Sequence, residues 1–463
     1  MVSVDVNISY QQSTNSGKFG QYSLSLTDGA GLQQNVELKF NFDDLWRIAH
    51  NTSSVAFDFL VFAMSVYNAD RAVSRAKYSE EGWKRNIHLR VPVVNVAAMN
   101  RGLDSFRSAV DFLTGDVWEF EFVQAAPYNY APSHIHIENL QDYGRVSLFS
   151  GGLDSLIGFI DGCTQISSGK KVLLISHAEL GKEGKDQTRI LGRCVNNRLF
   201  DGQYDRAFIS AGLKLQRGNT LVSEATFRAR SILFFAAGIY CANAISSDMP
   251  IIIPENGTIS LNIPLDKGRR SACSTRTTHP VFLRRLQSAL NAIGIQNPLV
   301  NPYQLKSKKD MVDDCCQYEE RKRALTLLCS DSCSCAKRSH KRYWVRRNVL
   351  HCGVCLPCLY RRVALSGVEE LRYERYGLDV FTPAEIQITR SDIKRNRDFK
   401  SLLYFLKNRC TREVVETELI ANGIIGKSNV KTYTDFVLHS YEQVKEWLRA
   451  NGNAEVKRMA GLR

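Results

Sequence analysis

The sequence predicts an α/β protein built on a parallel, doubly wound sheet, with an α+β region before it and a helical region after it. Three observations predict this class. A short apolar strand ends in the loop Ser150-Gly-Gly-Leu-Asp-Ser155 and leads into a helix. From Arg145 onward, short apolar runs alternate with helical patterns, which is typical of βαβ units. A cysteine-rich segment at 329–358 then separates this alternation from a charged C-terminal part.

The length of the chain, 463 residues, is enough for two or three domains with an apolar core. No apolar run is long enough to cross a membrane, and the alternating N-terminus is typical of a strand rather than a signal peptide. We therefore expect a cytoplasmic protein without a membrane partner. The expected divisions are an α+β domain at 1–143, the sheet domain at 144–320, the cysteine-rich segment at 321–366 and a helical region at 367–463.

The formal charge is +14, and much of the excess lies between Arg321 and Arg347. A solvated face is one interpretation of this basic region. A surface for an acidic protein or a phosphate-rich ligand is the other. Direct binding of nucleic acid is compatible with the charge but is not favoured.

In the N-terminal region, alternating apolar and polar residues predict strands, and a long apolar stretch predicts one helix. The helix is expected over 43–72, with Asp43 as its cap. The segment 126–132 is expected to be a linker. Strands are expected at 2–10, 36–42, 86–94 and 118–122, the last of them at a sheet edge.

In the sheet domain the pattern predicts four strands and the helices between them. Ligands of parallel sheets bind beyond the carboxyl ends of the strands. We therefore expect a ligand site where the loop at Ser150 meets the pair Ser176-His177, although His177 could equally be an ordinary loop residue. Strands are expected at 146–149, 172–176, 206–210 and 251–253, and helices at 154–166, 187–199 and 223–244.

The loop from Ser150 to Ser155 has the composition of an anion site. Gly151 and Gly152 permit a tight turn and a close approach of the backbone. The amides at a helix start carry a partial positive charge, and the two serines add hydroxyl donors. Asp154 would order the loop or help to hold Mg²⁺. A simple turn capped by Ser150 is the alternative, which the second glycine disfavours.

The thirteen cysteines are an odd number with uneven spacing and no export signal, which argues against a disulfide framework. Cys352, Cys355 and Cys358 have the spacing of metal ligands, and a tetrahedral zinc site needs one more. An iron–sulfur cluster is disfavoured because the sequence after Cys358 departs from the ferredoxin pattern. We expect a structural zinc. The candidates for the fourth ligand are Cys333 and Cys335, followed by Cys329, His340 and His351.

The Ser150 loop resembles the PP-loop of the ATP pyrophosphatases, which cleave ATP between the α and β phosphates. It lacks the Lys-Ser/Thr ending of an ordinary P-loop. Together with the cysteine triplet it resembles the QueC family, the 7-cyano-7-deazaguanine synthases, over residues 145–365. The Arg230-Ser-Ile-Leu-Phe segment and the Asn301-Pro-Tyr element with Lys308 and Asp310 also resemble that family. The family's Ser/Thr-Cys dipeptide is matched by Ser332-Cys333, so the resemblance favours Cys333 as the fourth zinc ligand.

The sequence departs from QueC in two places, and these departures indicate which branch of the family it resembles most. The first 143 residues have no counterpart in QueC, and its Gly-Tyr-Pro-Asp-Cys-Arg element is replaced by Pro254-Glu-Asn-Gly257 and Ser274-Thr-Arg-Thr-Thr-His-Pro280. The chain is therefore most similar to the QatC branch of QueC-like proteins, found in QatABCD anti-phage operons. The QueC-like members of one CBASS defence type are close alternatives.

The resemblance implies a Rossmann-like sheet of the PP-loop type, with ATP, Mg²⁺ and Zn²⁺ as cofactors. It implies adenylation of a 7-deazaguanine carboxylate and transfer of the acyl group to the N-terminus of an operon-encoded partner, a QatB-like acceptor. The N-terminal domain is expected to help dock that partner. The implied ATP-binding residues are Phe149, Ser150, Gly151, Gly152, Leu153, Asp154, Ser155, Ser176 and His177; the catalytic residues are Asp154, Lys308 and His279; and the substrate-binding residues are Arg230, Glu255, Asn256, Arg276 and Thr277.

The chemistry of these side chains is compatible with the implied roles. Glu255 and Asn256 would pair with the edge of a guanine-like base, and Arg276 would hold a carboxylate. His279 would act as general base for an attacking amine, although a histidine before proline is often structural. For Glu255 a tight turn, and for Arg276 a surface salt bridge, are the structural alternatives.

Three other functions are weighed against this one. The first is the ordinary nitrile-forming synthase of queuosine precursor supply, which uses ammonia. The second is a tRNA-modifying enzyme, which the charge suggests, although no cysteine near the sheet is placed for thiolation. The third is a non-catalytic scaffold subunit of a defence complex, against which the intact Ser150 loop and Lys308 argue.

Overall fold

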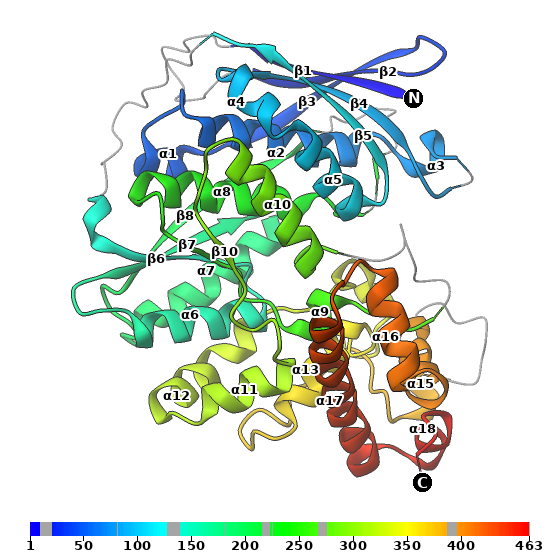
Figure 1. Ribbon diagram of the computed structural model, residues 1–463. Helices are drawn as coiled ribbons and strands as arrows, with labels where there is room; N and C mark the ends of the chain where they lie inside the picture. The colour runs from blue at the N-terminus through cyan, green and yellow to red at the C-terminus, as the bar shows by residue number, and fades with distance from the viewer. Residues whose placement is uncertain are drawn as a thin grey trace.

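The computed structural model describes residues 1–9, 21–80, 82–126, 139–179, 181–214, 223–224, 226–266, 276–386 and 396–462. Its framework is one mostly parallel sheet of ten strands, in the order β10-β9-β6-β7-β8-β3-β2-β1-β4-β5 (Figure 1). The strands are β1 (Val2–Ser9), β2 (Gln21–Thr27), β3 (Gln33–Asn41), β4 (Asn86–Val93), β5 (Val117–Gln124), β6 (Tyr143–Leu148), β7 (Lys171–His177), β8 (Tyr204–Leu213), β9 (Ile251–Ile252) and β10 (Leu299–Val300).

The half of the sheet formed by β8, β7, β6, β9 and β10 is entirely parallel. Counted along the chain, its strands lie in the order third, second, first, fourth, fifth. The direction of winding therefore reverses between β6 and β9. Crevices at such a switch point are where ligands bind in open α/β sheets. The expected parallel, doubly wound half is present.

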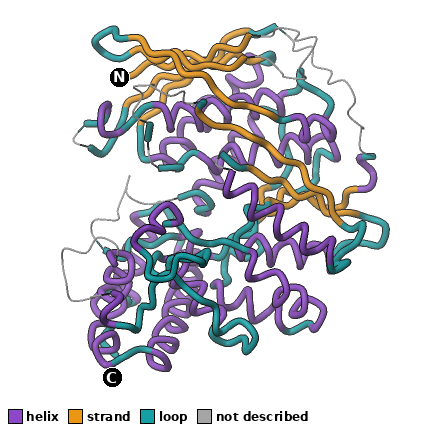
Figure 2. Tube along the Cα trace, turned by 180° about the vertical axis from the view of Figure 1, so that it is seen from behind, coloured by secondary structure: helices purple, strands orange, loops and turns teal. Residues whose placement is uncertain are grey.

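Alternate residues of β7 belong to two different cores, which shows that helices cover both faces of this half. Val172 and Leu174 pack with α6 (Leu153–Gln165) on one face. Leu173 and Ile175 pack with α8 (Arg230–Ile245) on the other. A strand buried on both faces reads as a continuous apolar run, which explains why these short strands were recognisable. Figure 2 shows the strands in the upper part of the molecule and helices and loops below them.

The N-terminal half of the sheet continues the parallel half without a break. β3 pairs antiparallel with β8, from Leu38 opposite Leu213 to Asn41 opposite Ser210. The sheet thus crosses the division expected at residue 143. One face of this half is apolar and buried, while the other carries polar residues, as the alternation in its strands predicts. β5 lies at the edge, as expected for 118–122.

The single helix expected over 43–72 is two helices, α1 (Asp43–Ala49) and α2 (Val55–Ala72). The chain leaves α1 through His50, which has a left-handed conformation with φ 49°. Ser54 then caps α2 by accepting a hydrogen bond from the amide of Phe57 at 3.1 Å. The N-cap of α1 is Phe42, and Asp43 is the first residue of the helix, so the prediction of Asp43 as the cap is wrong. The polar run between the two helices marks the break that apolar periodicity alone missed.

Two other helices of the sheet domain differ in extent from the expectation. The one expected at 187–199 is α7 (Gly181–Asn196), and the one expected at 223–244 is α8. Most of the expected linker at 126–132 lies outside the described residues. Further helices of the first two regions are α3 (Arg75–Tyr78), α4 (Val96–Arg101), α5 (Leu103–Thr114), α9 (Gly257–Leu261) and α10 (Pro280–Ala292).

The region after the sheet is helical, as expected, and its last helices lie at the end of the molecule opposite β1–β5 (Figure 1). Within the described ranges, no helix combines the length and the hydropathy needed to cross a bilayer. The helices are α11 (Lys308–Cys316), α12 (Glu319–Leu328), α13 (Leu356–Leu365), α14 (Pro383–Ile386), α15 (Arg397–Asn408), α16 (Arg412–Ala421), α17 (Lys427–Asn451) and α18 (Ala454–Met459).

Candidate functional site

The switch point between β6 and β9 brings together a carboxylate, a lysine and a carboxamide from three separate segments. Asp154 lies in the first turn of α6, directly after the loop that follows β6. Lys308, the first residue of α11, donates a hydrogen bond to its Oδ1 atom. Asn256, which follows β9, donates to its Oδ2 atom from the backbone at 3.2 Å and from Nδ2 at 2.6 Å. The side chains of Asp154 and Lys308 are both buried.

The position of Lys308 is set by the start of its helix. Ser307 caps α11 by accepting a hydrogen bond from the amide of Asp310 at 3.0 Å. The carboxylate of Asp310 in turn accepts from the amide of Ser307 at 2.8 Å, which completes a capping box. The cap fixes where the helix begins and therefore where its first side chain points.

Glu255 and Asp154 form an unequal pair of carboxyl groups. Burial raises the pKa of Glu255 well above its ordinary value of 4.5, and the charge of Asp154 and a hydrogen bond to it add to the shift. Burial by itself would raise the pKa of Asp154 too, but Lys308 and hydrogen bonds from Glu255, Lys308 and Asn256 lower it. The same burial therefore acts in opposite ways on the pKa values of the two carboxyl groups: the partners of Asp154 favour its charged form, and the surroundings of Glu255 favour its neutral form.

Asn256 has a structural part in this arrangement. Its Oδ1 atom accepts the amide of Ile259 at 3.0 Å and so caps α9, while its Nδ2 atom donates to Asp154 and, at 3.2 Å, to Glu255. These bonds use the amide that the sequence assigned to recognition of a base. The side chain holds the two carboxyl groups in place.

The loop after β6 is folded around its own hydroxyl groups. The amide of Gly151 donates to Ser155 Oγ at 3.1 Å, and the amide of Gly152 donates to Ser150 Oγ at 3.3 Å. Gly151 has φ 82°, a conformation that side chains other than glycine rarely adopt. The N-cap of α6 is Gly152, so Ser150 does not cap the helix itself; its hydroxyl group accepts the amide of Gly152 within the turn.

This loop can bind an anion. The amides at the start of a helix of this length carry a partial positive charge, and two serine hydroxyl groups lie beside them. Lys308 adds a full charge on the other side of Asp154.

The end of the neighbouring strand β7 lies beside the loop, as expected. Ser176 Oγ donates to the carbonyl of Phe149 at 3.2 Å. His177 is buried, its Nε2 atom lies 3.3 Å from the carbonyl of Ala211, and burial together with Arg230 lowers its pKa to about 3. His177 is therefore neutral. The ring of Phe149 packs on Phe159 in the core.

Gln187 was not predicted, yet it ties these two strand ends together. Its Nε2 atom donates to the carbonyl of His177 at 3.1 Å and to that of Ser150 at 3.4 Å. Its Cγ atom lies 3.2 Å from where a side chain on Gly151 would begin. No sequence pattern marks this residue, because α7 reaches the loop only through the packing of the sheet.

The turn before α10 holds two more of the residues assigned to the substrate, whereas Arg230 is the first residue of α8. Arg276 donates to the carbonyl of Phe112 at 3.2 Å and to Asn422 Oδ1 at 3.2 Å, and stacks on the Phe112 ring at 4.5 Å. Thr277 lies in the same turn, half-buried. Arg276 thus links the N-terminal half to the C-terminal helices.

His279 is the N-cap of α10. Its Nδ1 atom accepts from the amide of Val281 at 3.2 Å, and burial with nearby Arg276 lowers its pKa to about 3. A base so weak is poorly suited to take a proton at neutral pH. Ser260 of α9 donates to the carbonyl of Thr278 at 2.6 Å, which connects this turn to the segment after Asn256. The assigned roles of Arg276, Thr277 and His279 stay predictions.

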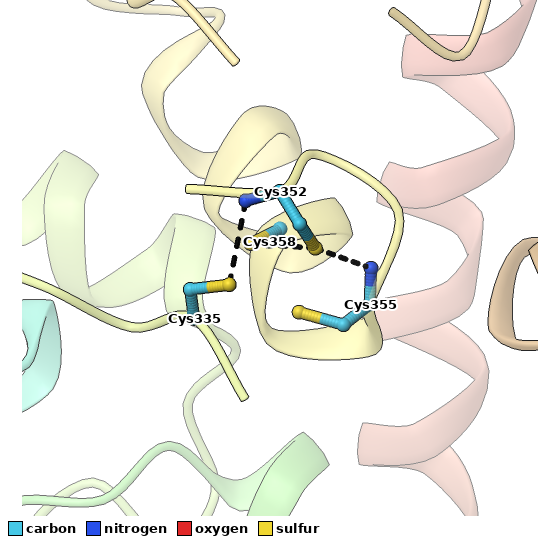
Figure 3. A group of neighbouring side chains, drawn as sticks. All are labelled: Cys335, Cys352, Cys355 and Cys358. Atoms are coloured by element: carbon cyan, nitrogen blue, oxygen red, sulfur yellow. Dashed lines mark hydrogen bonds between the residues drawn. The ribbon is translucent and has the colours of Figure 1, made fainter. Parts of the chain in front are cut away.

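Four cysteines form a second site, and their ligand atoms lie within 4.8 Å of one another (Figure 3). They are Cys335, Cys352, Cys355 and Cys358. Backbone amides point at the sulfur atoms: those of Val354 and Cys355 donate to Cys352 Sγ at 3.4 and 3.3 Å. Such donors stabilise thiolates, and four sulfur ligands suit a tetrahedral metal ion such as zinc. The group could therefore hold a metal.

Local backbone geometry gathers these thiols. Gly353 has φ 84°, and a side chain there would begin 2.4 Å from the carbonyl of Leu378. Only glycine permits this turn, which directs the following amides toward Cys352. The amide of Cys352 donates to Cys335 Sγ at 3.3 Å, which brings in the fourth cysteine across a gap of sixteen residues.

The fourth cysteine is Cys335, which corrects the preference for Cys333. The amide of Cys333 donates to the carbonyl of Gly151 at 2.8 Å, and its thiol lies 3.8 Å from the carbonyl of Leu350. Cys333 therefore belongs to the neighbourhood of the anion loop. The other candidates also lie outside the group, since His351 Nε2 accepts the amide of Ser334 at 3.2 Å and Cys329 Sγ accepts from Arg361.

A surface cavity of about 510 Å³ lies elsewhere, between α7 and α12. Its lining includes Arg193, Lys322, Arg323 and Glu370, with both signs of charge. Lys322 and Glu370 already pair with each other at 3.0 Å. The cavity contains no residue of the anion loop and is not part of the candidate site.

No protein-family model matches the chain, and neither curated proteins nor solved structures give a match to it. The candidate site is therefore defined by its own residues and their geometry.

Proposed function

We propose that the chain binds ATP at the switch point and cleaves it to AMP and pyrophosphate while activating a carboxylate. The main support for this proposal is the neighbourhood of the loop after β6. An anion loop at the end of β6 lies against a buried lysine and carboxylate contributed by Lys308 and Asp154. Triphosphate chemistry needs amides and cations placed around the phosphates, and a doubly wound sheet presents them at this point.

Each residue has a defined part in the proposed reaction. The amides of Gly151 and Gly152 donate to the hydroxyl groups of Ser155 and Ser150, and on binding of ATP these four groups would exchange their mutual bonds for bonds to phosphate oxygens. Lys308 would neutralise charge that develops on the departing pyrophosphate. Asp154 is the carboxylate that would hold Mg²⁺, which supplies further positive charge beside the phosphates when bound.

The raised pKa of Glu255 serves the same purpose. Two adjacent carboxylates would repel a triphosphate, and burial beside Asp154 favours the neutral form of Glu255.

The identity of the substrate rests on the resemblance to QueC-like proteins. We infer that a 7-deazaguanine carboxylate attacks the α-phosphorus of ATP, which breaks the bond to pyrophosphate and gives an acyl adenylate. The nitrogen of an amine then attacks the acyl carbon, AMP leaves, and the nitrogen loses a proton. The acceptor would be the N-terminus of a QatB-like protein in an anti-phage defence complex in the cytoplasm.

An α-amine suits this role better than a lysine side chain. The attacking nitrogen must be neutral, and the reference pKa of an α-amine is about 7.7–8.0, against about 10.4 for lysine. A protein acceptor also needs a docking surface. The N-terminal half and the basic residues between Arg321 and Arg347 would offer one, with an encounter rate that falls as salt rises.

We further propose that the metal of the four-cysteine group is Zn²⁺ and that its role is structural. Four thiolate ligands leave no open position for water or substrate. Metal analysis of the purified protein should find about one zinc per chain. Iron with inorganic sulfide, or active protein without metal, would refute this assignment.

The products of ATP turnover test the central claim. With a 7-deazaguanine carboxylate present, the protein should release AMP and pyrophosphate in equal amounts, and Asp154→Ala should not. ADP and phosphate as the main products would exclude this function.

The acceptor is tested by intact mass spectrometry of the partner protein, co-expressed with the wild type or with Asp154→Ala. An added deazaguanine acyl mass at the first residue, present only with the wild type, is the expected result. An unmodified partner together with free nitrile would instead identify an ammonia-using synthase. No turnover of ATP in the intact complex would identify a scaffold subunit.

A further inference from the structure

The segment that supplies Cys335 to the four-cysteine group also touches the anion loop. Residues 333–335, which we call the bracket, run from one site to the other. The amide of Cys333 donates to the carbonyl of Gly151 at 2.8 Å. Ser334 Oγ accepts the amide of Leu153 at 3.3 Å. Cys335 Sγ then belongs to the four-cysteine group.

The bond from Cys333 sets the direction of a loop amide. In a planar trans peptide, the C=O of one residue and the N–H of the next point in opposite directions. Because the carbonyl of Gly151 faces the bracket, the N–H of Gly152 faces away from it, into the loop, where it reaches Ser150 Oγ. The bracket therefore orients an amide that the proposed function assigns to phosphate.

The hydrogen bond to Ser334 uses the backbone amide of Leu153 and leaves the hydroxyl group of Ser334 as a donor beside the loop. It occupies the N–H of Leu153, one of the amides at the start of α6. In the described part of the chain, the hydroxyl hydrogen of Ser334 has no acceptor. Ser334 also lies close to Gly152: a Cβ atom placed on that glycine would be 4.0 Å from Ser334 Oγ, which is van der Waals contact. The serine thus presents its own O–H beside the loop.

The other side of the bracket is anchored to the cysteine group. The amide of Ser334 donates to His351 Nε2 at 3.2 Å, and His351 directly precedes Cys352. Cys335 Sγ accepts the amide of Cys352 at 3.3 Å. Adjacent Cα atoms are about 3.8 Å apart, so a shift of Cys335 must move Ser334 with it.

We propose that Ser334 is a positioning residue that couples the metal site to the anion loop, so that metal and anion bind cooperatively. This inference rests on the proposed function for the identity of the anion. A metal ion that fixes Cys335 would hold the bracket, and the bracket would hold the loop in its binding conformation. By reciprocity, an anion on the loop would slow the loss of the metal.

The first test uses the full-length protein and inorganic pyrophosphate as the probe. Hydrogen exchange of the peptide covering residues 148–156 is compared before and after a chelator removes the metal. Exchange should become faster on removal, and the affinity for pyrophosphate should fall on the order of tenfold, within the range of about 5–150-fold found for coupled sites. Equal exchange in both states would overturn the proposal.

The second test needs no metal-free protein and so stands even if metal removal unfolds the chain. The rate at which a chromophoric chelator takes the metal is measured with and without pyrophosphate. Pyrophosphate should slow this release in the wild type and in Ser334→Thr, which keeps the hydroxyl group, but much less in Ser334→Ala. Ser339→Ala, an exposed serine between Cys335 and Cys352, is the matched control and should behave as the wild type.

These outcomes separate the coupling from the proposed function. Ser334→Ala with full metal content and an undiminished effect of pyrophosphate would refute the role of Ser334. A metal-loaded wild type that binds neither pyrophosphate nor ATP would refute the proposed function, while metal-dependent exchange of residues 148–156 would still support the bracket.

Discussion

The buried cluster of acidic and basic side chains in the N-terminal half differs from the one at the switch point in how its charges are matched. In the N-terminal half, Arg85 donates to Asp70 at 2.5 Å and to Asp116 at 2.6 Å, and Arg75 also pairs with Asp116. Two guanidinium groups share these two carboxyl groups, and Arg75 also lies 4.0 Å from Glu224. At the switch point, Lys308 bonds to one of two carboxyl groups, and burial raises the pKa of the other, Glu255.

The difference indicates what each cluster is for. Burial by itself would lower the pKa of Arg85, but Asp70 and Asp116 raise it, so this guanidinium group has a carboxylate partner on each side. Such a cluster ties strands and helices together. At the switch point Lys308 bonds to Asp154 alone, and the start of α6, with its partial positive charge, lies beside the pair. Perturbed, incompletely matched groups of this kind mark functional sites.

Breaking the N-terminal cluster should give the largest effect on stability. Arg85→Met leaves two buried carboxylates with a single remaining arginine, which should cost about 3–5 kcal/mol. Urea unfolding followed by circular dichroism measures the loss. Arg90→Met is the control: Arg90 pairs with Asp5 and Glu121 on the exposed face, where solvent screens the charges, so the loss of stability should be far smaller. Equal losses in both variants would show that the buried cluster is not special.

Breaking the switch-point cluster should instead affect turnover. Asp154→Asn keeps the size of the side chain but removes its charge, and AMP release should fall on the order of a hundredfold or more. The urea midpoint should change far less than in Arg85→Met. Asp161→Asn alters the same helix away from the loop, where Asp161 accepts from Tyr303 at 2.6 Å, and its turnover per folded molecule should be retained. Loss of turnover in both would point to the helix rather than to the carboxylate.

The raised pKa of Glu255 should make the stability of the protein depend on pH. The folded state binds the proton of Glu255 more tightly than the unfolded state, whose pKa is about 4.5. The free energy of unfolding gained in this way is fully present below the unfolded pKa and is lost as pH rises through the folded pKa. Glu255→Gln mimics the protonated acid at every pH. The variant should therefore gain stability relative to the wild type as pH rises from about 5 to about 9, measured by urea unfolding at several pH values. A constant difference across this range would mean that Glu255 is not protonated in the fold.

The smallest effect is expected from the cap that places Lys308. Ser307→Ala removes the acceptor for the amide of Asp310 and should cost about 1 kcal/mol of stability. It should also lower turnover, because the first residue of α11 loses its fixed position. Thr411→Ala removes the cap of α16, far along the chain, with a similar cost and no change in turnover. Unchanged turnover in Ser307→Ala would show that Asp154 alone positions Lys308.

The sequence by itself determined the local parts of this protein. Apolar runs identified four of the five strands of the parallel half, because strands buried on both faces are mostly apolar. The fifth, β10, has only two residues and was not predicted. The paired glycines and serines after β6 indicated an anion loop, and the spacing of Cys352, Cys355 and Cys358 indicated a metal site. Each of these signals is carried by neighbouring residues, so a single segment contains all of it.

Only the tertiary structure decided which distant segments meet. The strand order placed Asn256 and Glu255 beside Asp154. The pairing of β3 with β8 joined the two halves of the sheet. Gln187 reached the loop through the packing of its helix. The choice between Cys333 and Cys335 was of the same kind. The two cysteines are only two residues apart, yet the amide of Cys333 bonds to the loop, whereas the thiol of Cys335 joins the other three thiols. Spacing along the chain states how near two residues can come, whereas the direction of a side chain follows from the fold around it.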